Sequence, residues 1–262
     1  MNKTAIIILL FFSGLSKLVY GQSISAKEVM QKNDLQRIGN KEYSKLSMTL
    51  INKQGGKRER QLDIKLFKDK DNNLSQIIKF HSPSDIKGTA FLSIEHHDKS
   101  DDQWMYLPAF KKTRRISSSF EKGYFAGSDF TFEDLNREDF LEYDYKLLST
   151  VKVNGTPCYH IEATPLSSNK KKNSGYSKRE IFIEKKDYIM VKSIYYDKKG
   201  EKIKVFTASN IKKVPGSDVT RSYTIEMNNI KSNRKTILNY LKIETGCCVE
   251  ANDFSLRYLT QQ

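Results

Sequence analysis

The sequence predicts a mainly β fold, in which a single antiparallel, strongly curled sheet is covered by a few α-helices. About a dozen short runs of alternating apolar and polar residues follow one another from residue 43 onward, and such alternation is typical of half-buried strands. Turn pairs separate the runs, for example Asn154 before Gly155 and Pro215 before Gly216. No helices alternate with the strands, as they would in a parallel sheet.

Residues 1–21 predict a cleaved signal peptide, which leaves residues 22–262 as one domain. Lys3 precedes an apolar run over residues 5–12, and Gly21 provides a small residue at the cleavage site. A membrane anchor is the alternative, but this run is well short of the roughly 20 residues needed to cross a bilayer. No Cys follows the run as a site for lipid attachment. We therefore expect a secreted protein.

The first element of the mature chain is predicted to be an amphipathic helix over residues 25–39. Ser25 and Glu28 have the spacing of a capping box, and Gly39 can end the helix. Strand runs follow at residues 43–51, 58–67, 74–80 and 89–94. Residues 53–56 read Lys-Gln-Gly-Gly and predict a hairpin turn between the first two strands.

The second half repeats the strand pattern after one interruption. A strand that ends at Leu107 meets Pro108, and residues 111–119 predict a second, polar strand. A short helix is predicted over residues 133–140, with Ser128, Asp129 or Thr131 as its N-cap. Strand runs then recur at residues 143–153, 158–163, 179–184, 188–196, 203–209, 219–228 and 236–243. A sheet of this length must curl, and helices must cover its remaining apolar face.

The chain is strongly basic, with a formal charge of +14 and a pI near 9.4. Signal cleavage would remove Lys3 and Lys17 and no acidic residue, which lowers the formal charge by two, to +12. This charge suits an anionic membrane surface or lipid head groups. Nucleic acid is the other usual partner of a basic chain, but a secreted protein rarely meets it, so we expect none. A solvated basic surface without a specific partner is the simplest alternative.

The stretch over residues 104–135 concentrates large rings, cations and glycines. Its rings include Trp104, Tyr106, Phe125, Phe130 and Phe132, and its cations include Lys111, Lys112, Arg114 and Arg115. Strand alternation places Trp104 and Tyr106 on one face. Bulky apolar surface beside a cationic rim suits a long apolar ligand. The alternative is that the rings form core and the cations form a solvated edge.

No motif of a known catalytic or cofactor site is present, so we expect neither an enzyme nor a bound cofactor. Ser117, Ser118 and Ser119 do not form a G-x-S-x-G elbow, and the sequence has no Walker A, G-x-G-x-x-G or H-E-x-x-H motif. His96, His97 and Asp98 resemble metal ligands but have no further ligand nearby, so we expect no metal site there.

The three cysteines are Cys158, Cys247 and Cys248. Adjacent cysteines bridge each other only with a distorted backbone. Cys158 could pair with either of the other two in an oxidising compartment. Thiolate metal binding is not expected, because no C-x-x-C spacing occurs.

Two central segments carry a specific resemblance. Residues 104–119 read WMYLPAFKKTRRISSS and residues 125–135 read FAGSDFTFEDL. These segments resemble the signature of the LolA/LolB-like outer-membrane lipoprotein-sorting proteins. Weaker supporting stretches lie at residues 82–92, 155–162, 195–200 and 254–259. The resemblance therefore covers nearly the whole mature chain.

This resemblance implies an unclosed β-barrel of about 11 strands, capped by helices, around a hydrophobic cavity for acyl chains. The implied function is that of a monomeric periplasmic carrier in a Gram-negative bacterium, which sorts lipoproteins or other lipids towards the outer membrane. An inner-membrane transporter would be its partner. The N-terminal helix and the helix after Phe132 would form a lid, with Gly123 and Gly127 permitting movement.

On this interpretation, the ligand-binding residues are Trp104, Tyr106, Phe125, Phe130 and Phe132. Lys111, Lys112, Arg114 and Arg115 would form a basic rim that contacts a head group or the membrane. The competing hypothesis is a non-enzymatic adaptor module, which binds a membrane transporter or a membrane surface through its basic face.

Overall fold

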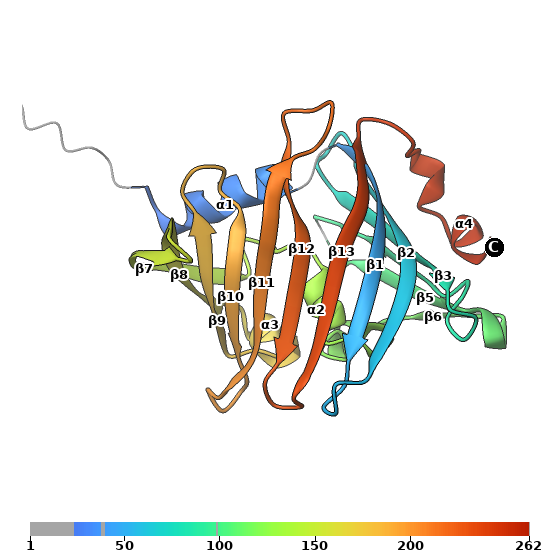
Figure 1. Cartoon of the computed structure of the whole chain (residues 1–262), viewed down its shortest axis with the longest axis horizontal. Helices are drawn as coiled ribbons and strands as arrows, with labels where there is room; N and C mark the ends of the chain where they lie inside the picture. The colour runs from blue at the N-terminus through green and yellow to red at the C-terminus, as the bar shows by residue number, and fades with distance from the viewer. Residues whose placement is uncertain (1–23, 38–39, 98, 262) are drawn as a thin grey trace, which may run out of the picture.

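The computed structural model describes residues 24–37, 40–97 and 99–261. Over these residues, thirteen strands form one antiparallel sheet (Figure 1). The first six are β1 (Lys41–Ile51), β2 (Lys57–Lys68), β3 (Leu74–Ser82), β4 (Ala90–Ile94), β5 (Asp102–Leu107) and β6 (Lys112–Arg115). The others are β7 (Tyr143–Val153), β8 (Thr156–Pro165), β9 (Lys178–Glu184), β10 (Met190–Tyr196), β11 (Lys202–Lys213), β12 (Thr220–Asn229) and β13 (Arg234–Thr245).

The strand order is β6-β5-β4-β3-β2-β1-β13-β12-β11-β10-β9-β8-β7. The first and last strands pair at the centre, and β6 and β7 are the two free edges, so the sheet is open. The predicted fold class, a single open antiparallel sheet with a few helices, is thereby confirmed. Two details differ, because the described strands number thirteen rather than about 11, and the sheet bends less strongly than expected.

Strand alternation divides the sheet into two faces. On β3, Ile78 packs in the central cluster, whereas its neighbour Ile77 packs in a second cluster with the C-terminal segment. We call these the inner face and the outer face. On β1, every second residue is buried from Glu42 to Met48, which matches the period of two expected for a strand.

Short helices and turns accompany the sheet. The α-helices are α1 (Ala26–Arg37), α2 (Phe132–Leu135), α3 (Ser168–Asn173) and α4 (Leu256–Thr260). The 3-10 turns are Pro108–Phe110, Ser118–Phe120, Phe125–Gly127 and Ala251–Asp253. In the described part of the chain, no helix is both long and apolar enough to cross a membrane. The predicted signal peptide lies outside the described residues.

Helix α1 begins as predicted. The Ser25 backbone N–H donates to Glu28 Oε2 at 2.8 Å, and the Glu28 N–H donates to Ser25 Oγ at 3.2 Å, which completes the capping box. The predicted stop at Gly39 lies outside the described residues. Ala26, Val29 and Met30 of α1 pack on β7, β8 and β9, so α1 covers this part of the inner face.

Helix α2 is shorter than the predicted helix over residues 133–140. Thr131 is its N-cap and forms a capping box with Asp134. The helix stops after Leu135 because Asn136 is extended, with φ −73° and ψ 150°. Residues 137–142 therefore leave the helix axis.

The segment between β6 and β7 packs against the inner face of the sheet. Ile116, Phe125, Phe130 and Phe132 join a cluster to which both halves of the sheet contribute. Other members of this cluster are Leu46, Met48, Leu62, Ile78, Phe80, Phe91, Phe206, Met227 and Leu238. Residues 116–135 thus form a plug against the sheet, and the term plug is used below for this segment.

Candidate functional site

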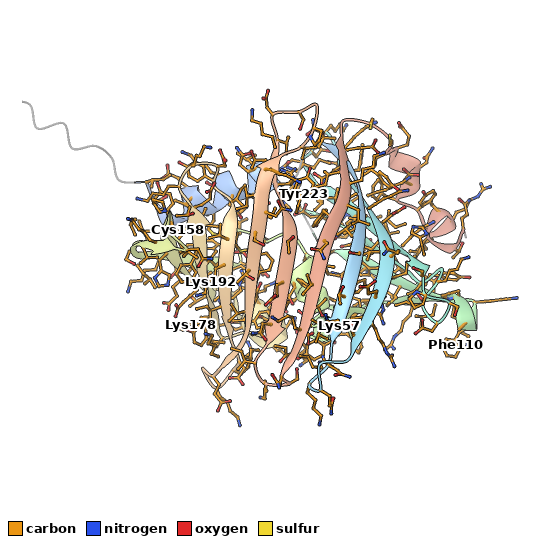
Figure 2. All side chains as sticks on the ribbon, viewed as in Figure 1. Lys57, Phe110, Cys158, Lys178, Lys192 and Tyr223 are labelled. Atoms are coloured by element: carbon orange, nitrogen blue, oxygen red, sulfur yellow. The ribbon has the colours of Figure 1, made fainter. Side chains whose placement is uncertain are left out.

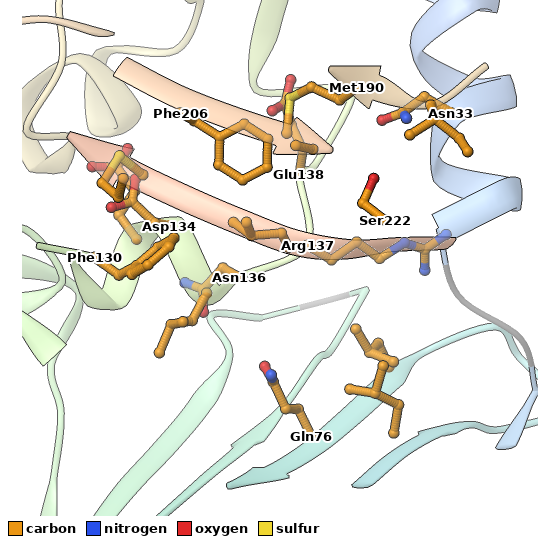
Figure 3. Close-up of a pocket in the computed structure, with 18 of the residues that line it drawn as sticks. Asn33, Gln76, Phe130, Asp134, Asn136, Arg137, Glu138, Met190, Phe206 and Ser222 are labelled. Atoms are coloured by element: carbon orange, nitrogen blue, oxygen red, sulfur yellow. The ribbon is translucent and has the colours of Figure 1, made fainter. Parts of the chain in front are cut away.

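A cavity of about 230 Å³ lies between the inner face, helix α1 and residues 130–138 (Figure 3). Its apolar lining includes Ile64, Leu66, Phe206, Ala208, Ile225 and Met227. These residues come from β2, β11 and β12, so the walls belong to both halves of the sheet. Burial of apolar surface in such a space is favourable because it removes that surface from water.

The end of the cavity beside α1 is polar. Figure 3 shows Asn33, Arg137 and Ser222 there, with Phe130 and Phe206 further along. The Ser222 hydroxyl oxygen and Arg179 Nε are buried and have no hydrogen-bond partner among the described residues. Both residues line the cavity. An unpartnered buried polar atom is costly, so a hydrogen-bond acceptor placed beside either atom would remove that cost.

Arg137 fastens the end of α1 across this polar end. Its Nε lies 3.0 Å from each carboxylate oxygen of Asp34, and its Nη1 lies 3.2 Å from Glu95 Oε2. The side chains of Arg137 and Asp34 are 9% and 8% exposed. A bidentate contact of this kind is both strong and directional, so Arg137 fixes where α1 ends.

A second arginine holds α1 from the other side of the opening. Arg221 of β12 donates through Nη2 to Glu42 Oε2 at 2.9 Å and through Nη1 to the backbone carbonyl of Gln36. Gln36 belongs to the last turn of α1, where carbonyl groups lack partners within the helix. Arg137 therefore joins α1 to the segment after the plug, and Arg221 joins it to the sheet.

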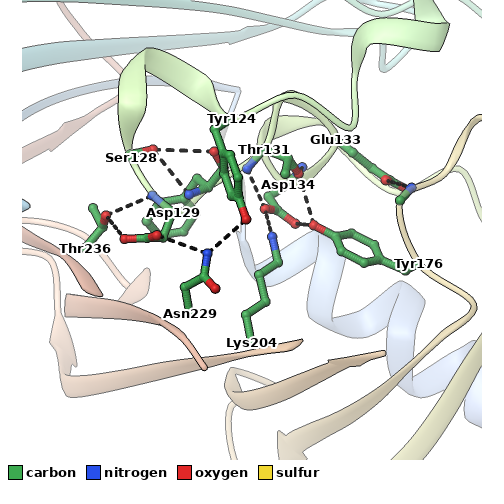
Figure 4. Close-up of polar contacts among 12 residues, drawn as sticks. Tyr124, Ser128, Asp129, Thr131, Glu133, Asp134, Tyr176, Lys204, Asn229 and Thr236 are labelled. Atoms are coloured by element: carbon green, nitrogen blue, oxygen red, sulfur yellow. Dashed lines mark hydrogen bonds and ion pairs between the residues drawn. The ribbon is translucent and has the colours of Figure 1, made fainter. Parts of the chain in front are cut away.

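The plug is fixed by buried polar contacts (Figure 4). Lys204 of β11 forms an ion pair with Asp134, and both side chains are 3% exposed. The Tyr176 hydroxyl donates to Asp134 Oδ1 at 2.8 Å. Asp129 accepts from Thr236 Oγ1 at 2.9 Å and from Arg234 Nη2 at 3.0 Å. Because these partners lie on β11, on β13 and just before β9, the plug is tied to the second half of the sheet.

A separate polar depression of about 550 Å³ lies outside the plug. It is lined by residues of the 95–101 loop, residues 133–142 and α3. Burial above all, and also the nearby carboxylates of Asp101, Glu133 and Glu142, raise the pKa of Glu121 to about 7, although Lys170 lowers it. Burial likewise raises the pKa of Asp101 to about 6. This depression thus contains carboxyl groups that titrate near neutral pH.

Comparisons with known proteins agree with this architecture. A family model for an uncharacterized protein matches residues 72–261. The structure of an outer membrane lipoprotein-sorting protein domain from Vibrio parahaemolyticus is 31% identical, with a TM-score of 0.83, over 90% of this chain and 98% of that chain. The chain belongs to this outer-membrane lipoprotein-sorting family. The family resemblance drawn from the sequence is thereby confirmed.

Two further structures are similar. A DUF1329 family protein from Desulfovibrio piger ATCC 29098 is 27% identical, with a TM-score of 0.82, over 89% of this chain and 97% of that chain. A LolA superfamily protein from Nitrosomonas europaea is 17% identical, with a TM-score of 0.70, over 90% of this chain and 100% of that chain, and it shows a shared fold. No curated protein matches the sequence.

The five predicted ligand-binding rings do not gather at one site in this lipoprotein-sorting family member. Phe130 lines the cavity. Phe125 and Phe132 lie in the aromatic core of the plug, where their ring centroids are 5.7 Å apart. Tyr106 is buried and Trp104 is half-buried on the outer face, under the C-terminal segment. The predicted alternation on β5 is correct, because Met105 instead packs against the inner cluster.

The predicted basic rim is an edge strand and the turn before it. All four residues of β6 are exposed, and Lys111 takes a left-handed conformation with φ 49°. Arg115 forms an ion pair with Asp102 at 2.6 Å, and the Arg114 guanidinium lies 5.0 Å from the Phe120 ring centroid. Cations on a free edge also prevent strands of other chains from pairing there. At the tip, the Phe110 side chain is 69% exposed and projects from the molecule (Figure 2).

Sequence patterns did not predict the charged residues that frame the cavity. Asp34, Arg137, Arg179 and Arg221 belong to no motif in the sequence, and their partners lie far away along the chain. The one available signal was the position of Asp34 on a helix with few apolar residues. Cys158 is a buried free thiol in β8, and the exposed Cys247 and Cys248 are also free, so neither pairing with Cys158 forms. Of the His96, His97 and Asp98 group, Asp98 lies outside the described residues, and His96 Nε2 contacts Asp102 at 2.9 Å.

Proposed function

We propose that this chain is a periplasmic carrier that shelters the acyl chains of lipoproteins or other lipids during transfer towards the outer membrane. The observation that carries the proposal is the apolar cavity under α1, in a family whose structural relative is described as an outer-membrane lipoprotein-sorting domain. The proposal includes cleavage of residues 1–21, a single mature domain over residues 22–262 and a monomeric carrier. It includes no catalytic step.

The size of the cavity requires movement on binding. Ligand pockets usually span about 300–1,000 Å³, and the cavity here holds about 230 Å³. Each buried methylene group contributes about 0.8 kcal/mol, so a larger opening for whole acyl chains would give useful affinity. The helix most suited to move is α1, because it covers the inner face. Arg137 and Arg221 fasten its end, so its movement would break these contacts.

The polar end of the cavity favours an amphiphile over a plain hydrocarbon. Arg179 Nε and the Ser222 hydroxyl have no hydrogen-bond partner among the described residues. Each could donate a hydrogen bond to an oxygen of an ester or head group. The apolar side would hold the chains. This arrangement matches the few placed polar groups that orient ligands in mainly apolar pockets.

A matched pair of substitutions on β11 tests the proposal. Ala208 lines the cavity, whereas its neighbour Ser209 is exposed. We expect mature protein to take up a fluorescent fatty acid and to copurify with lipid detectable by native mass spectrometry. Ala208→Trp should fill the cavity and abolish uptake, while Ser209→Trp should retain it. Absence of uptake by the unchanged protein, or equal uptake by both variants, would contradict the carrier function.

A second candidate function is docking on a membrane surface as an adaptor. The observation that favours it is the β5–β6 hairpin, which exposes Phe110 beside Lys111, Lys112 and Arg114. An apolar ring flanked by cations suits an interface with anionic lipids. The two functions are compatible, because a carrier must reach a membrane to exchange its cargo.

A further inference from the structure

Two adjacent thiols and a carboxylate meet where strand β13 ends. The Cys247 and Cys248 sulfur atoms are 2.9 Å apart, and both side chains are exposed and free. A carboxylate oxygen of Glu244 lies within 4.8 Å of both sulfur atoms. Among the described residues, this is the one group of three or more His, Cys, Asp and Glu side chains that lie close enough together to ligate a metal ion.

The backbone turn brings the two sulfur atoms to the same side. Consecutive side chains of an extended strand point to opposite faces. Here Gly246 has φ 77° and Cys248 has φ 63°, and these left-handed residues on both sides of Cys247 break the alternation. The left-handed conformation is unfavourable for Cys, which has a Cβ atom, so the backbone of this turn is strained at Cys248.

A disulfide between the two residues is disfavoured by chain geometry. Consecutive Cα atoms across a trans peptide are about 3.8 Å apart, whereas Cα atoms of a disulfide are usually about 4.4–6.8 Å apart. The pair is therefore better suited to bind something between its sulfur atoms than to close on itself.

We infer that Glu244, Cys247 and Cys248 form a binding site for a soft divalent metal ion such as Zn²⁺. Thiolate sulfur and carboxylate oxygen are ordinary zinc ligands, and a water molecule can complete four-coordination. With Zn–S bonds of about 2.3 Å and tetrahedral angles, the sulfur atoms would lie roughly 3.8 Å apart. They need to separate by about 1 Å from the distance in the structure, which exposed side chains can do by small rotations.

The neighbouring charge adjusts the strength of this site. Lys242 Nζ lies 2.8 Å from Glu244 Oε1, so it competes with the metal ion for that carboxylate. Both side chains are accessible, at 54% and 30% exposed, and an ion pair of this kind is weak. The metal ion can therefore displace the ammonium group. Because bound thiols lose their protons, binding also releases protons.

The site lies next to the start of the C-terminal segment. Val249 is fully buried, and Phe254 and Leu259 pack with it on the outer face. Glu250 also forms an ion pair with Lys41 at 3.4 Å. A metal ion held by Cys247 and Cys248 would restrict the turn that joins this segment to the sheet.

Zinc titration of the reduced protein tests the inference. We expect one Zn²⁺ per chain by calorimetry, with proton release, and protection of Cys247 and Cys248 from alkylation as read by peptide mass spectrometry. Cys247→Ser and Cys248→Ser should each lower affinity at least tenfold, and Glu244→Gln should lower it less. Cys158→Ser is the matched control, since Cys158 is buried in β8, and it should bind zinc unchanged.

Two results would overturn the inference. One is zinc binding that survives both exposed-cysteine substitutions, and the other is one Zn²⁺ per two chains, which would mean that thiols of two molecules share the ion. Fatty-acid uptake by Cys248→Ser should equal that of the unchanged protein, so a failed zinc test is distinguishable from a failed carrier.

Discussion

The Arg137 Nη2 atom lies 2.5 Å from Asp34 Oδ2, although the two residues are 103 positions apart in the sequence. Asp34 is near the end of α1, and Arg137 follows the plug. The contact joins the helix that covers the cavity to the segment that fills the sheet. Opening of the cavity by movement of α1 requires this ion pair to break.

Substitution of Arg137 by Ala should therefore destabilise the fold and speed cavity opening. Removal of one partner from a buried ion pair costs about 3–5 kcal/mol, because the other charge stays buried without compensation. Asp34→Ala should cost less, since Glu95 remains 3.2 Å from Arg137. Urea unfolding measures both costs, and the uptake rate of a fluorescent fatty acid measures opening.

An exposed ion pair provides the control for this prediction. Lys213 and Asp218 are 3.1 Å apart, with side chains 68% and 101% exposed. Lys213→Ala should change the free energy of unfolding by less than about 1 kcal/mol. If Arg137→Ala and Lys213→Ala had equal effects, the Arg137 contact would not fasten α1.

The pKa of Glu121 predicts a loss of stability as the pH rises. Its value in the fold, about 7, lies above the ordinary value of 4.5, so the folded state binds more protons than the unfolded state between these values. The contribution of this group is complete below its ordinary pKa and is lost as the pH rises through about 7. Asp101, raised to about 6, acts in the same direction.

Glu121→Gln should remove most of this dependence. The amide imitates the protonated carboxyl group and can still accept from Gln103 Nε2, which lies 3.2 Å from Glu121. At about pH 8 we expect the variant to be more stable than the unchanged protein by on the order of 1–3 kcal/mol. Urea unfolding at several pH values measures this, and an unchanged slope in Glu121→Gln would show that Glu121 does not titrate in this range.

The position of Phe125 predicts a structural rather than a ligand-binding role. Its side chain is 1% exposed, and its ring centroid lies 5.9 Å from Phe80 and 5.6 Å from Phe91. Phe125→Ala should cost about 3–5 kcal/mol of stability, while Phe110→Ala, at an exposed position, should cost less than about 0.5 kcal/mol. Thermal or urea unfolding decides this, and a similar small cost for both would place Phe125 outside the core.

The hairpin at the β6 edge predicts binding to anionic membranes. Each Lys near such a surface contributes about 1 kcal/mol, so Lys111→Glu with Lys112→Glu should weaken binding to phosphatidylglycerol vesicles by about 30-fold or more. Phe110→Ser should weaken it further, and salt should do the same. Vesicle cosedimentation measures the binding, with phosphatidylcholine vesicles as the uncharged reference.

A matched charge change on α3 distinguishes the effect of the hairpin on vesicle binding from the effect of net charge. Lys171 and Lys172 are also adjacent and exposed. Lys171→Glu with Lys172→Glu changes the net charge equally and should leave vesicle binding close to that of the unchanged protein. Equal losses in both double variants would mean that the total charge, and not the hairpin, attracts the protein to the membrane.

Local patterns predicted the local features of this fold and none of its long-range contacts. The capping box at Ser25 and the alternation on β1 depend on residues close in the sequence, so they could be predicted. The alternation on β5 placed Trp104 and Tyr106 together but could not show that the C-terminal segment covers them. That depends on Phe254 and Leu259, far along the chain, as the roles of Arg137 and Arg221 depend on Asp34 and Glu42.

The strand order has a consequence for how the protein folds. Every pair of neighbouring strands is consecutive in the sequence except β1 and β13, so β1–β6 and β7–β13 can each assemble from local hairpins. Within the sheet, the ladder between β1 and β13, which includes Met48 opposite Leu238, is the one that joins these halves. Such non-local pairing is slow because loop-closure entropy opposes it. Since Ile64 and Phe206 line the cavity from opposite halves, the cavity forms only when β1 and β13 pair.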